Sequence, residues 1–147
     1  MELDQAVKEA IYGFVAQEGR PPVLDETAAQ VGAGRDDVRA ACQRLGVSRQ
    51  LVLMPDGESI RMAGPFSGVP TQHVVRANGR RYFANCAWDA FGIPAALRAE
   101  AEIESRCEQS GEPLRLHCGI DGPPPTPSWV FHSVVPAAHW WRDVVYT

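Results

Sequence analysis

No part of the 147-residue sequence is apolar over a length that would cross a bilayer. The first ten residues, MELDQAVKEA, are acidic and amphipathic, and they lack the apolar core of a secretory signal peptide. We therefore expect a cytoplasmic protein that has no membrane partner.

Positive charge is also scarce, since 14 basic residues stand against 18 acidic ones and the formal net charge is −4. A mildly acidic protein is a poor general binder of phosphate backbones. The sequence contains no glycine-rich phosphate loop, no Ser–His–Asp order and no protein-kinase signature. Hydrophobic residues make up 45% of the chain, which is typical of a globular protein of one ordinary domain or two small ones.

Cysteine is sparse and unpaired in the sequence, and its four positions are Cys42, Cys86, Cys107 and Cys118. The absence of a C-x-x-C pair argues against a structural zinc knuckle. A secreted disulfide scaffold would be shorter and richer in cysteine. We therefore expect free thiols, which are either small buried apolar groups or reactive sites.

The first part of the chain predicts three helices followed by a β-hairpin. The helices are expected at residues 2–18, at 25–32 with Asp25 as N-cap, and at 35–46 with Gly46 at the end, and the hairpin turns at Asp56-Gly57. This is the outline of a winged helix-turn-helix domain over residues 1–63, followed by a Gly/Pro linker over 64–70. The domain has seven basic residues against ten acidic ones. A helix that reads DNA needs a positive face, so we do not expect a nucleic-acid partner.

The second part of the chain, residues 71–147, predicts strands and one short helix. Asn78-Gly79 indicates a tight hairpin turn between strands at 71–77 and 80–83. A helix is expected over 86–97, interrupted near Gly92 and Pro94. Further strands are expected at 101–107, 113–118 and 128–135, with a helix or turn beginning at Pro136.

The segment Asn85-Cys86-Ala87-Trp88-Asp89 carries the chemistry that the sequence suggests. In a helix, Cys86 and Asp89 lie three residues apart on one face, and aromatic and aliphatic residues surround them. Burial would raise the pKa of the carboxyl group and leave it able to donate a proton. A carboxylate would also raise the pKa of the thiol. A thiol beside an acid suits the binding of a soft metal or electrophile with delivery of a proton, because thiolate is the ligand that soft metals select. The alternative is a buried cysteine next to an aspartate that either caps the helix or lies on the surface.

Three stretches of the sequence resemble the alkylmercury (organomercurial) lyases. They are HVVRANGRRYFANCAWDAFGIPAAL at 73–97, EIESRCEQSGEPLRL at 102–116 and FHSVVPAAHW at 131–140. The first resembles the active-site stretch of that family, in which a hairpin leads into a C-x-x-D segment that closes on a proline. The resemblance implies an α+β fold, with a winged-helix-like unit followed by a mixed β-sheet domain with short helices.

The resemblance also implies protonolysis of a carbon–mercury bond. In that family two cysteines and an aspartate act together: one thiolate takes the mercury, the second adds electron density, and the aspartate passes a proton to the carbon. By position, Cys86 would be the thiolate and Asp89 the proton carrier, whereas Cys107 would match a structural cysteine. The region of the second catalytic cysteine, residues 125–128 here, contains no thiol. Cys118 could supply that sulfur, a segment beyond residue 147 could carry it, or the substrate could be another compound.

Two other functions stay open at this point. The chain could bind a soft metal, mercury or copper(I), without turnover, through Cys86, Asp89 and Cys118, with His117 as a further ligand. It could also be a transcription regulator that senses a thiol-reactive ligand. We expect no resident cofactor in the lyase, since mercury arrives with the substrate, and the partner is a small organometallic compound or a soft metal ion. The oligomeric state does not follow from the sequence.

Overall fold

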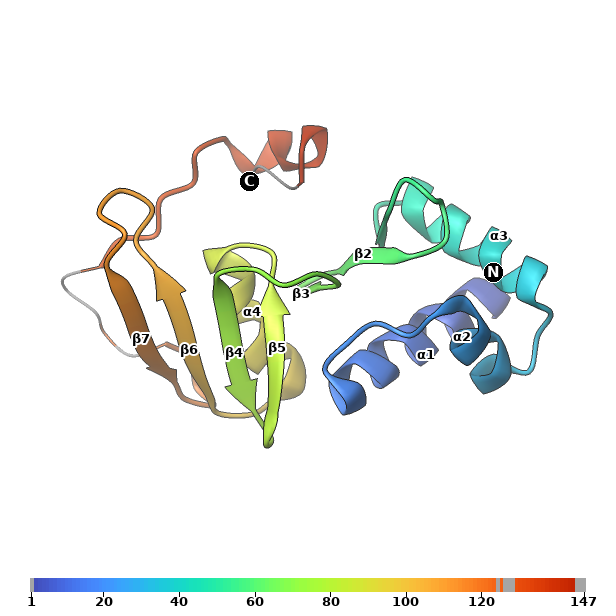
Figure 1. The fold of residues 1–147 in the computed structure, drawn as a ribbon, viewed down its shortest axis with the longest axis horizontal. Helices are drawn as coiled ribbons and strands as arrows, with labels where there is room; N and C mark the ends of the chain where they lie inside the picture. The colour runs from blue at the N-terminus through green and yellow to red at the C-terminus, as the bar shows by residue number, and fades with distance from the viewer. Residues whose placement is uncertain (1, 124, 126–128, 145–147) are drawn as a thin grey trace. The chain divides into compact units, whose positions relative to one another are not determined.

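The computed structural model describes residues 2–123, 125 and 129–144. The chain divides into two compact units, Met1–Pro70 and Thr71–Thr147, and each is described by itself (Figure 1). Among the described residues, no helix combines the length and the apolar character that a membrane span requires.

Three helices form the larger part of the first unit. They are α1 (Glu2–Glu18), α2 (Leu24–Val31) and α3 (Arg35–Val47). Their apolar stripes face one another, so that Val7, Ile11 and Val38 are fully buried. The predicted start of α2 and the predicted end of α3 were wrong. The N-cap of α2 is Val23, whose N–H donates to the Glu26 carboxylate at 2.8 Å, and α3 continues through Gly46 to Val47.

Three short strands complete this unit, in the order β1 (Val52–Leu53), β2 (Ile60–Ala63) and β3 (Phe66–Ser67). Both neighbouring pairs are antiparallel. Strand β3 lies inside the predicted linker at 64–70, because the buried Phe66 pairs with Ala63 of β2. The backbone then passes so close to β2 that a Cβ at Gly68 would collide with the carbonyl oxygen of Ile60.

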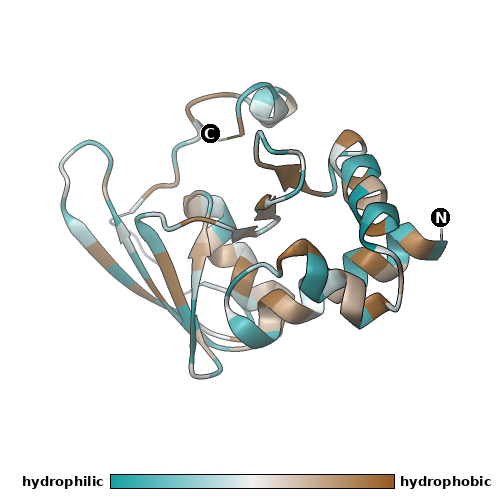
Figure 2. Cartoon of the chain, turned by 45° about the vertical axis from the view of Figure 1, so that its right-hand side comes forward, coloured by the Kyte–Doolittle hydropathy of each residue, from teal (hydrophilic) through white to brown (hydrophobic). Residues whose placement is uncertain are grey.

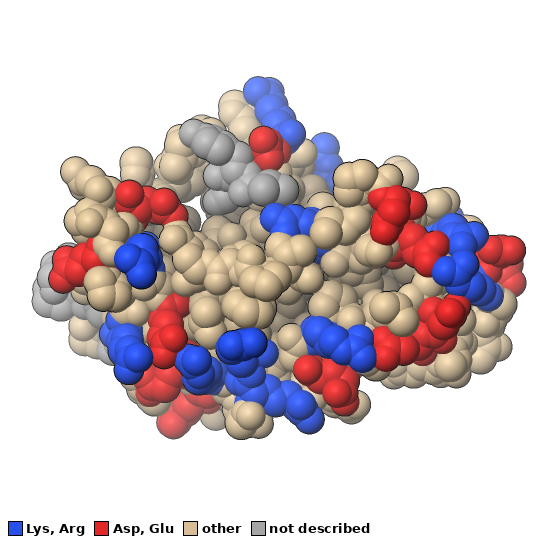
Figure 3. All heavy atoms as spheres, in the orientation of Figure 1, with Lys and Arg blue, Asp and Glu red and all other residues tan. Residues whose placement is uncertain are grey.

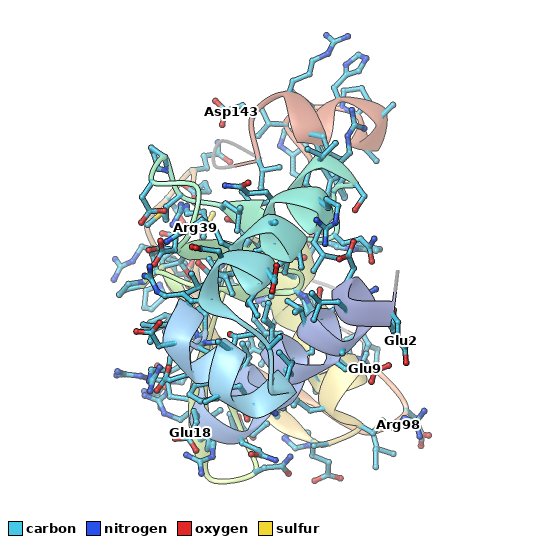
Figure 4. All side chains as sticks on the ribbon, turned by 90° about the vertical axis from the view of Figure 1, so that its right-hand side faces the viewer. Glu2, Glu9, Glu18, Arg39, Arg98 and Asp143 are labelled. Atoms are coloured by element: carbon cyan, nitrogen blue, oxygen red, sulfur yellow. The ribbon has the colours of Figure 1, made fainter. Side chains whose placement is uncertain are left out.

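The arginines of α3 all have carboxylate partners. Arg35 pairs with Asp25 and Glu58, Arg39 with Asp36 and Glu58, and Arg44 with Asp4. Figure 3 shows basic and acidic side chains next to each other over this unit, and Figure 4 labels Arg39 on α3. Paired arginines do not present the free positive face that a DNA-reading helix needs. The winged-helix description and the absence of a nucleic-acid partner remain predictions.

The second unit is built on a four-stranded sheet. Its strands are β4 (His73–Ala77), β5 (Arg80–Ala84), β6 (Ala101–Arg106) and β7 (Pro113–Cys118). The order is β5-β4-β6-β7, and all three neighbouring pairs are antiparallel, whereas a mixed sheet was expected. Asn78 and Gly79 both have positive φ, as the predicted tight turn between β4 and β5 requires. Figure 2 shows apolar and polar residues alternating along these strands.

Helix α4 (Ala87–Leu97) packs on this sheet against β4, β5 and β6 (Figure 1). Ile93 of the helix and Val75, Tyr82 and Ile103 of the strands are buried between them. The helix runs without a break through Gly92 and Pro94, although an interruption was expected there. The combination of helices with this sheet confirms the α+β class.

The chain after β7 does not form the strand that was predicted at 128–135. Residues 129–135 are irregular, and Ser128 lies outside the described residues. A short 3₁₀ helix, η1, then spans Ala137–Arg142. Trp140 braces this part, since its indole N–H donates to the carbonyl oxygen of Val135 at 3.0 Å. We call residues 129–144 the C-terminal segment.

Candidate active site

Cys86 stands at the junction between β5 and α4. Its backbone is extended, with φ −144° and ψ 178°, and it is the N-cap residue of α4. The Cys86 carbonyl oxygen accepts the first helical hydrogen bond, from Ala90 N–H at 3.1 Å. Ala84 before it and Ala90 after it are both buried, so the turn that carries the thiol is held at both ends.

Asp89 lies in the first turn of α4, on the same side as Cys86. The Cys86 thiol donates to Asp89 Oδ2 at 3.5 Å, and both side chains are half-buried. The main-chain N–H of Cys86 also favours the carboxylate form of Asp89. The C-x-x-D spacing therefore brings the sulfur and the carboxyl group together at the start of the helix.

Burial makes both groups harder to ionise, and the Asp89 carboxylate adds to this effect at Cys86. Burial raises the pKa of Asp89, and its contacts with Cys86 oppose that rise only in part. The pKa of Cys86 is raised first by burial and further by the negative charge of Asp89, while the N–H groups of Asp89 and Trp88 oppose the rise. At neutral pH the thiol thus keeps its proton until an electrophile displaces it. The carboxylate at 3.5 Å is placed to receive that proton.

Substitution of Asp89 by asparagine should lower the pKa of Cys86. The change removes the negative charge that favours the protonated thiol, and the amide oxygen that replaces the carboxylate is a weaker acceptor, so the thiolate should form at lower pH than in the unmodified protein. The rate of iodoacetamide alkylation at Cys86 against pH, followed on the tryptic peptide that contains it, measures the pKa. An unchanged or upward-shifted profile would contradict the electrostatic coupling.

Two further residues beside this pair bind the C-terminal segment. The Asn85 side-chain amide donates to the carbonyl oxygen of Val144 at 2.8 Å, and the ring of Trp88 lies 5.6 Å from the ring of Phe131. Trp88 was expected to contribute to the apolar surroundings of Cys86 and Asp89, and it is 57% exposed. Asn85 and Phe131 were not singled out from the sequence. The contacts join residues more than 40 positions apart, so no local pattern signals them.

The other predicted site residues lie elsewhere. Cys118 is 3% exposed at the end of β7, where its thiol donates to the Gly119 carbonyl oxygen. His117 faces the opposite side of the strand and contacts Glu102 at 2.7 Å. Over residues 2–123, 125 and 129–144, no three His, Cys, Asp or Glu side chains are grouped to hold a metal ion. The structure therefore brings Cys86 and Asp89 together, but it does not assemble the predicted set of Cys86, Asp89 and Cys118.

Cys107, the expected structural cysteine, lies just after β6 in the turn to β7. Its main-chain N–H donates to the carbonyl oxygen of Glu112, which closes the turn. The side chain of Ser110 and the N–H groups of Ser110 and Gln109 lower the pKa of the Cys107 thiol. Cys42, in the first unit, behaves in the opposite way, because burial raises the pKa of its thiol to about 11. Neither thiol lies in the turn that carries Cys86 and Asp89.

A family model described as alkylmercury lyase matches residues 66–147, which is more than half of the chain and includes Cys86 and Asp89. The chain belongs to the alkylmercury lyase family. Curated relatives support this assignment. The chain is 31% identical to alkylmercury lyases of Staphylococcus epidermidis over 100 residues and of Streptomyces lividans over 105 residues; each match covers 67% of this chain and 44% of the relative.

A shorter alignment with the alkylmercury lyase of Bacillus cereus is 39% identical over 53 residues, covering 36% of this chain and 24% of the relative. The chain thus spans less than half the length of these alkylmercury lyases. Among solved structures, the mercury-bound form of MerB2 is similar with a TM-score of 0.63 and 24% identity, over 86% of this chain and 68% of that one. This likeness confirms the expected alkylmercury-lyase-like fold.

Proposed function

We propose that this member of the alkylmercury lyase family cleaves carbon–mercury bonds by protonolysis, with Cys86 as the mercury ligand and Asp89 as the proton carrier. The contact between the Cys86 thiol and Asp89 Oδ2 at 3.5 Å carries the proposal. A thiol, the type of group that soft metals select, and a carboxyl group of raised pKa thus lie on one turn, within the part of the chain that matches the family.

The reaction begins with the exchange of one mercury ligand. The proton of the Cys86 thiol moves to the Asp89 carboxylate, and the sulfur forms a bond to mercury while a solution thiolate leaves the organomercurial. Burial favours the neutral acid at Asp89, so the proton stays beside the mercury-bound carbon. The organic group is now held on Cys86 through mercury, next to a proton donor.

Protonolysis follows within the same turn of α4. The carboxylic acid of Asp89 gives its proton to the carbon, the electron pair of the carbon–mercury bond becomes the new carbon–hydrogen bond, and the hydrocarbon leaves. Asp89 returns to the carboxylate, and mercury(II) remains on Cys86. Thiolates in solution then take up the mercury, and Cys86 regains a proton from water.

The source of the second sulfur is the point on which this chain departs from the family pattern. Residues 125–128 carry no thiol, and Cys118 is buried and is not grouped with Cys86 and Asp89. We propose that a thiol in solution supplies the second sulfur to mercury during the reaction. Turnover should therefore depend on the concentration of added thiol.

Release of hydrocarbon tests the proposal directly. The protein, incubated with phenylmercury acetate and excess cysteine, is expected to release benzene. In heavy water the benzene should carry one deuterium, because the acidic proton that replaces mercury exchanges with the solvent. Headspace gas chromatography with mass spectrometry measures both the yield and the isotope. Folded protein that yields no benzene above the thiol-only control would rule out the lyase activity.

The second candidate function is binding of a soft metal without turnover, and the absence of a second grouped thiol beside Cys86 in the described part of the chain favours it. The same incubation separates the two functions. Mercury(II) or copper(I) retained in equimolar amount through Cys86, with the organic group still attached in the case of phenylmercury, would indicate a binding protein.

A further inference from the structure

The C-terminal segment contacts the reactive turn on both sides of Cys86. Asn85, the residue before the cysteine, donates a hydrogen bond to the carbonyl oxygen of Val144. Trp88, two positions after the cysteine, contacts the ring of Phe131. Figure 1 shows this segment at the same end of the second unit as the loop from β5 to α4. The contacts lie near the two ends of the segment, and Cys86 lies between their partners in the sequence.

The C-terminal segment is stabilised by hydrogen bonds within itself, but it buries few residues against the rest of the second unit. Trp140 holds it together through its bonds to Val135 and to the Ser133 hydroxyl. In contrast, η1 has no buried residue, and Val130 is 88% exposed. A piece that buries so little surface opens at low free-energy cost, so each contact that fastens it has a large share in keeping it closed.

The contact at Phe131 also places apolar surface beside the site. Trp88 is 57% exposed and Phe131 is 43% exposed, although their rings meet. Exposed aromatic surface of this kind is favourable where an apolar ligand covers it. The organic group of an organomercurial is such a ligand, and Trp88 lies next in sequence to the proposed proton carrier.

We propose that Asn85 and Trp88 are positioning residues that fasten the C-terminal segment over the Cys86 turn, so that this segment forms one wall of the site and limits which organomercurials reach the thiol. The proposal rests on the proposed function for the nature of the substrate. The fastening itself can be tested without any turnover. A fastened segment restricts bulky reagents more than small ones, and its release removes that difference.

The test measures alkylation of Cys86 by a small reagent, iodoacetamide, and by a bulky one, N-phenylmaleimide. The variants are Asn85→Leu, which removes the donor at nearly constant size, and Phe131→Ala, which removes the ring. Tryptic digestion separates the peptides of Cys86 and Cys107, so Cys107 in the β6–β7 turn is an internal standard. Val130→Ala is the matched control, because it shortens an exposed apolar side chain of the same segment.

Both variants are expected to speed labelling of Cys86 by N-phenylmaleimide about tenfold, which corresponds to the loss of one contact of about 1.4 kcal/mol, and to speed labelling by iodoacetamide less. The rate at Cys107 and the behaviour of Val130→Ala should stay as in the unmodified protein. Equal acceleration with both reagents would indicate a change in thiol pKa instead, and unchanged rates would mean that the segment does not control access. Either result overturns the proposal.

Cys42 and Cys118 are buried, so alkylation of these two thiols, measured in the same digest, reveals loss of the fold. If Asn85→Leu or Phe131→Ala exposes them, the milder Phe131→Leu decides the question by the same comparison of reagents. Labelling needs no substrate, so a protein without lyase activity can still support the fastened segment. Conversely, a lyase whose Cys86 labels at the same rate in every variant keeps the proposed function and loses this inference.

Discussion

Cys86→Ser is expected to end the release of benzene from phenylmercury and to remove tight binding of mercury(II). A serine oxygen is a hard donor that stays protonated at neutral pH, whereas mercury selects thiolate. The fold should survive, because Cys86 is the N-cap of α4 and serine is among the best residues at that position. Gas chromatography measures the benzene, and equilibrium dialysis with mercury(II) measures the binding.

Cys107→Ser is the matched control for this change. Cys107 is half-buried in the turn between β6 and β7 and should contribute little to either measurement. Benzene release at the unmodified rate from a folded Cys86→Ser protein would contradict the assignment of Cys86. Loss of activity in both variants would point to damage to the fold, which circular dichroism would reveal.

Asp89→Asn is expected to separate binding from cleavage. Asparagine has nearly the same shape as aspartate and keeps a side-chain oxygen, so α4 should still begin after Cys86. The asparagine side chain is not acidic enough to donate a proton to the mercury-bound carbon. Since a positioned general acid typically contributes about 10²- to 10⁴-fold, the rate of hydrocarbon release should fall by that order while phenylmercury remains bound to Cys86.

Intact-protein mass spectrometry after a short incubation distinguishes the two steps. The Asp89→Asn protein should accumulate the phenylmercury adduct, whereas the unmodified protein should show mercury alone or none. Asp121→Asn is a suitable control, because Asp121 is an exposed carboxylate in the chain after β7. An Asp89→Asn protein that releases benzene at the unmodified rate would show that the proton comes from another donor.

The pairing of Cys86 with Asp89 was predictable because it is local. Residues three apart at the start of a helix lie on one face whatever surrounds them. The N-cap position of Cys86 was not predicted, since the helix was expected to begin at residue 86 and it begins at Ala87. The same reason makes the tight turn at Asn78-Gly79 and the extent of α1 readable from the chain. Each depends on hydrogen bonds and spacings within a few residues.

Contacts between distant residues could not be predicted in this way. The apolar residues after Ser128 suggested a strand, but residues 129–135 are irregular and the ring of Phe131 contacts that of Trp88 instead. Likewise the short pairing of β3 with β2 lies in a stretch whose glycines and prolines indicated a linker. In both cases packing against a neighbouring element outweighed local preference.

The sequence by itself determined which thiol and which carboxyl group share a helical turn, and the order of the helices and most strands. Only the tertiary structure decided how far that pair is buried, and burial raises the pKa of both groups. It also decided the surroundings of the pair. Cys118 is buried at the end of β7, and Asn85 and Trp88 bind a segment that follows them by more than 40 residues. Desolvation and long-range contact depend on what the folded chain places around a residue, which its neighbours in sequence do not specify.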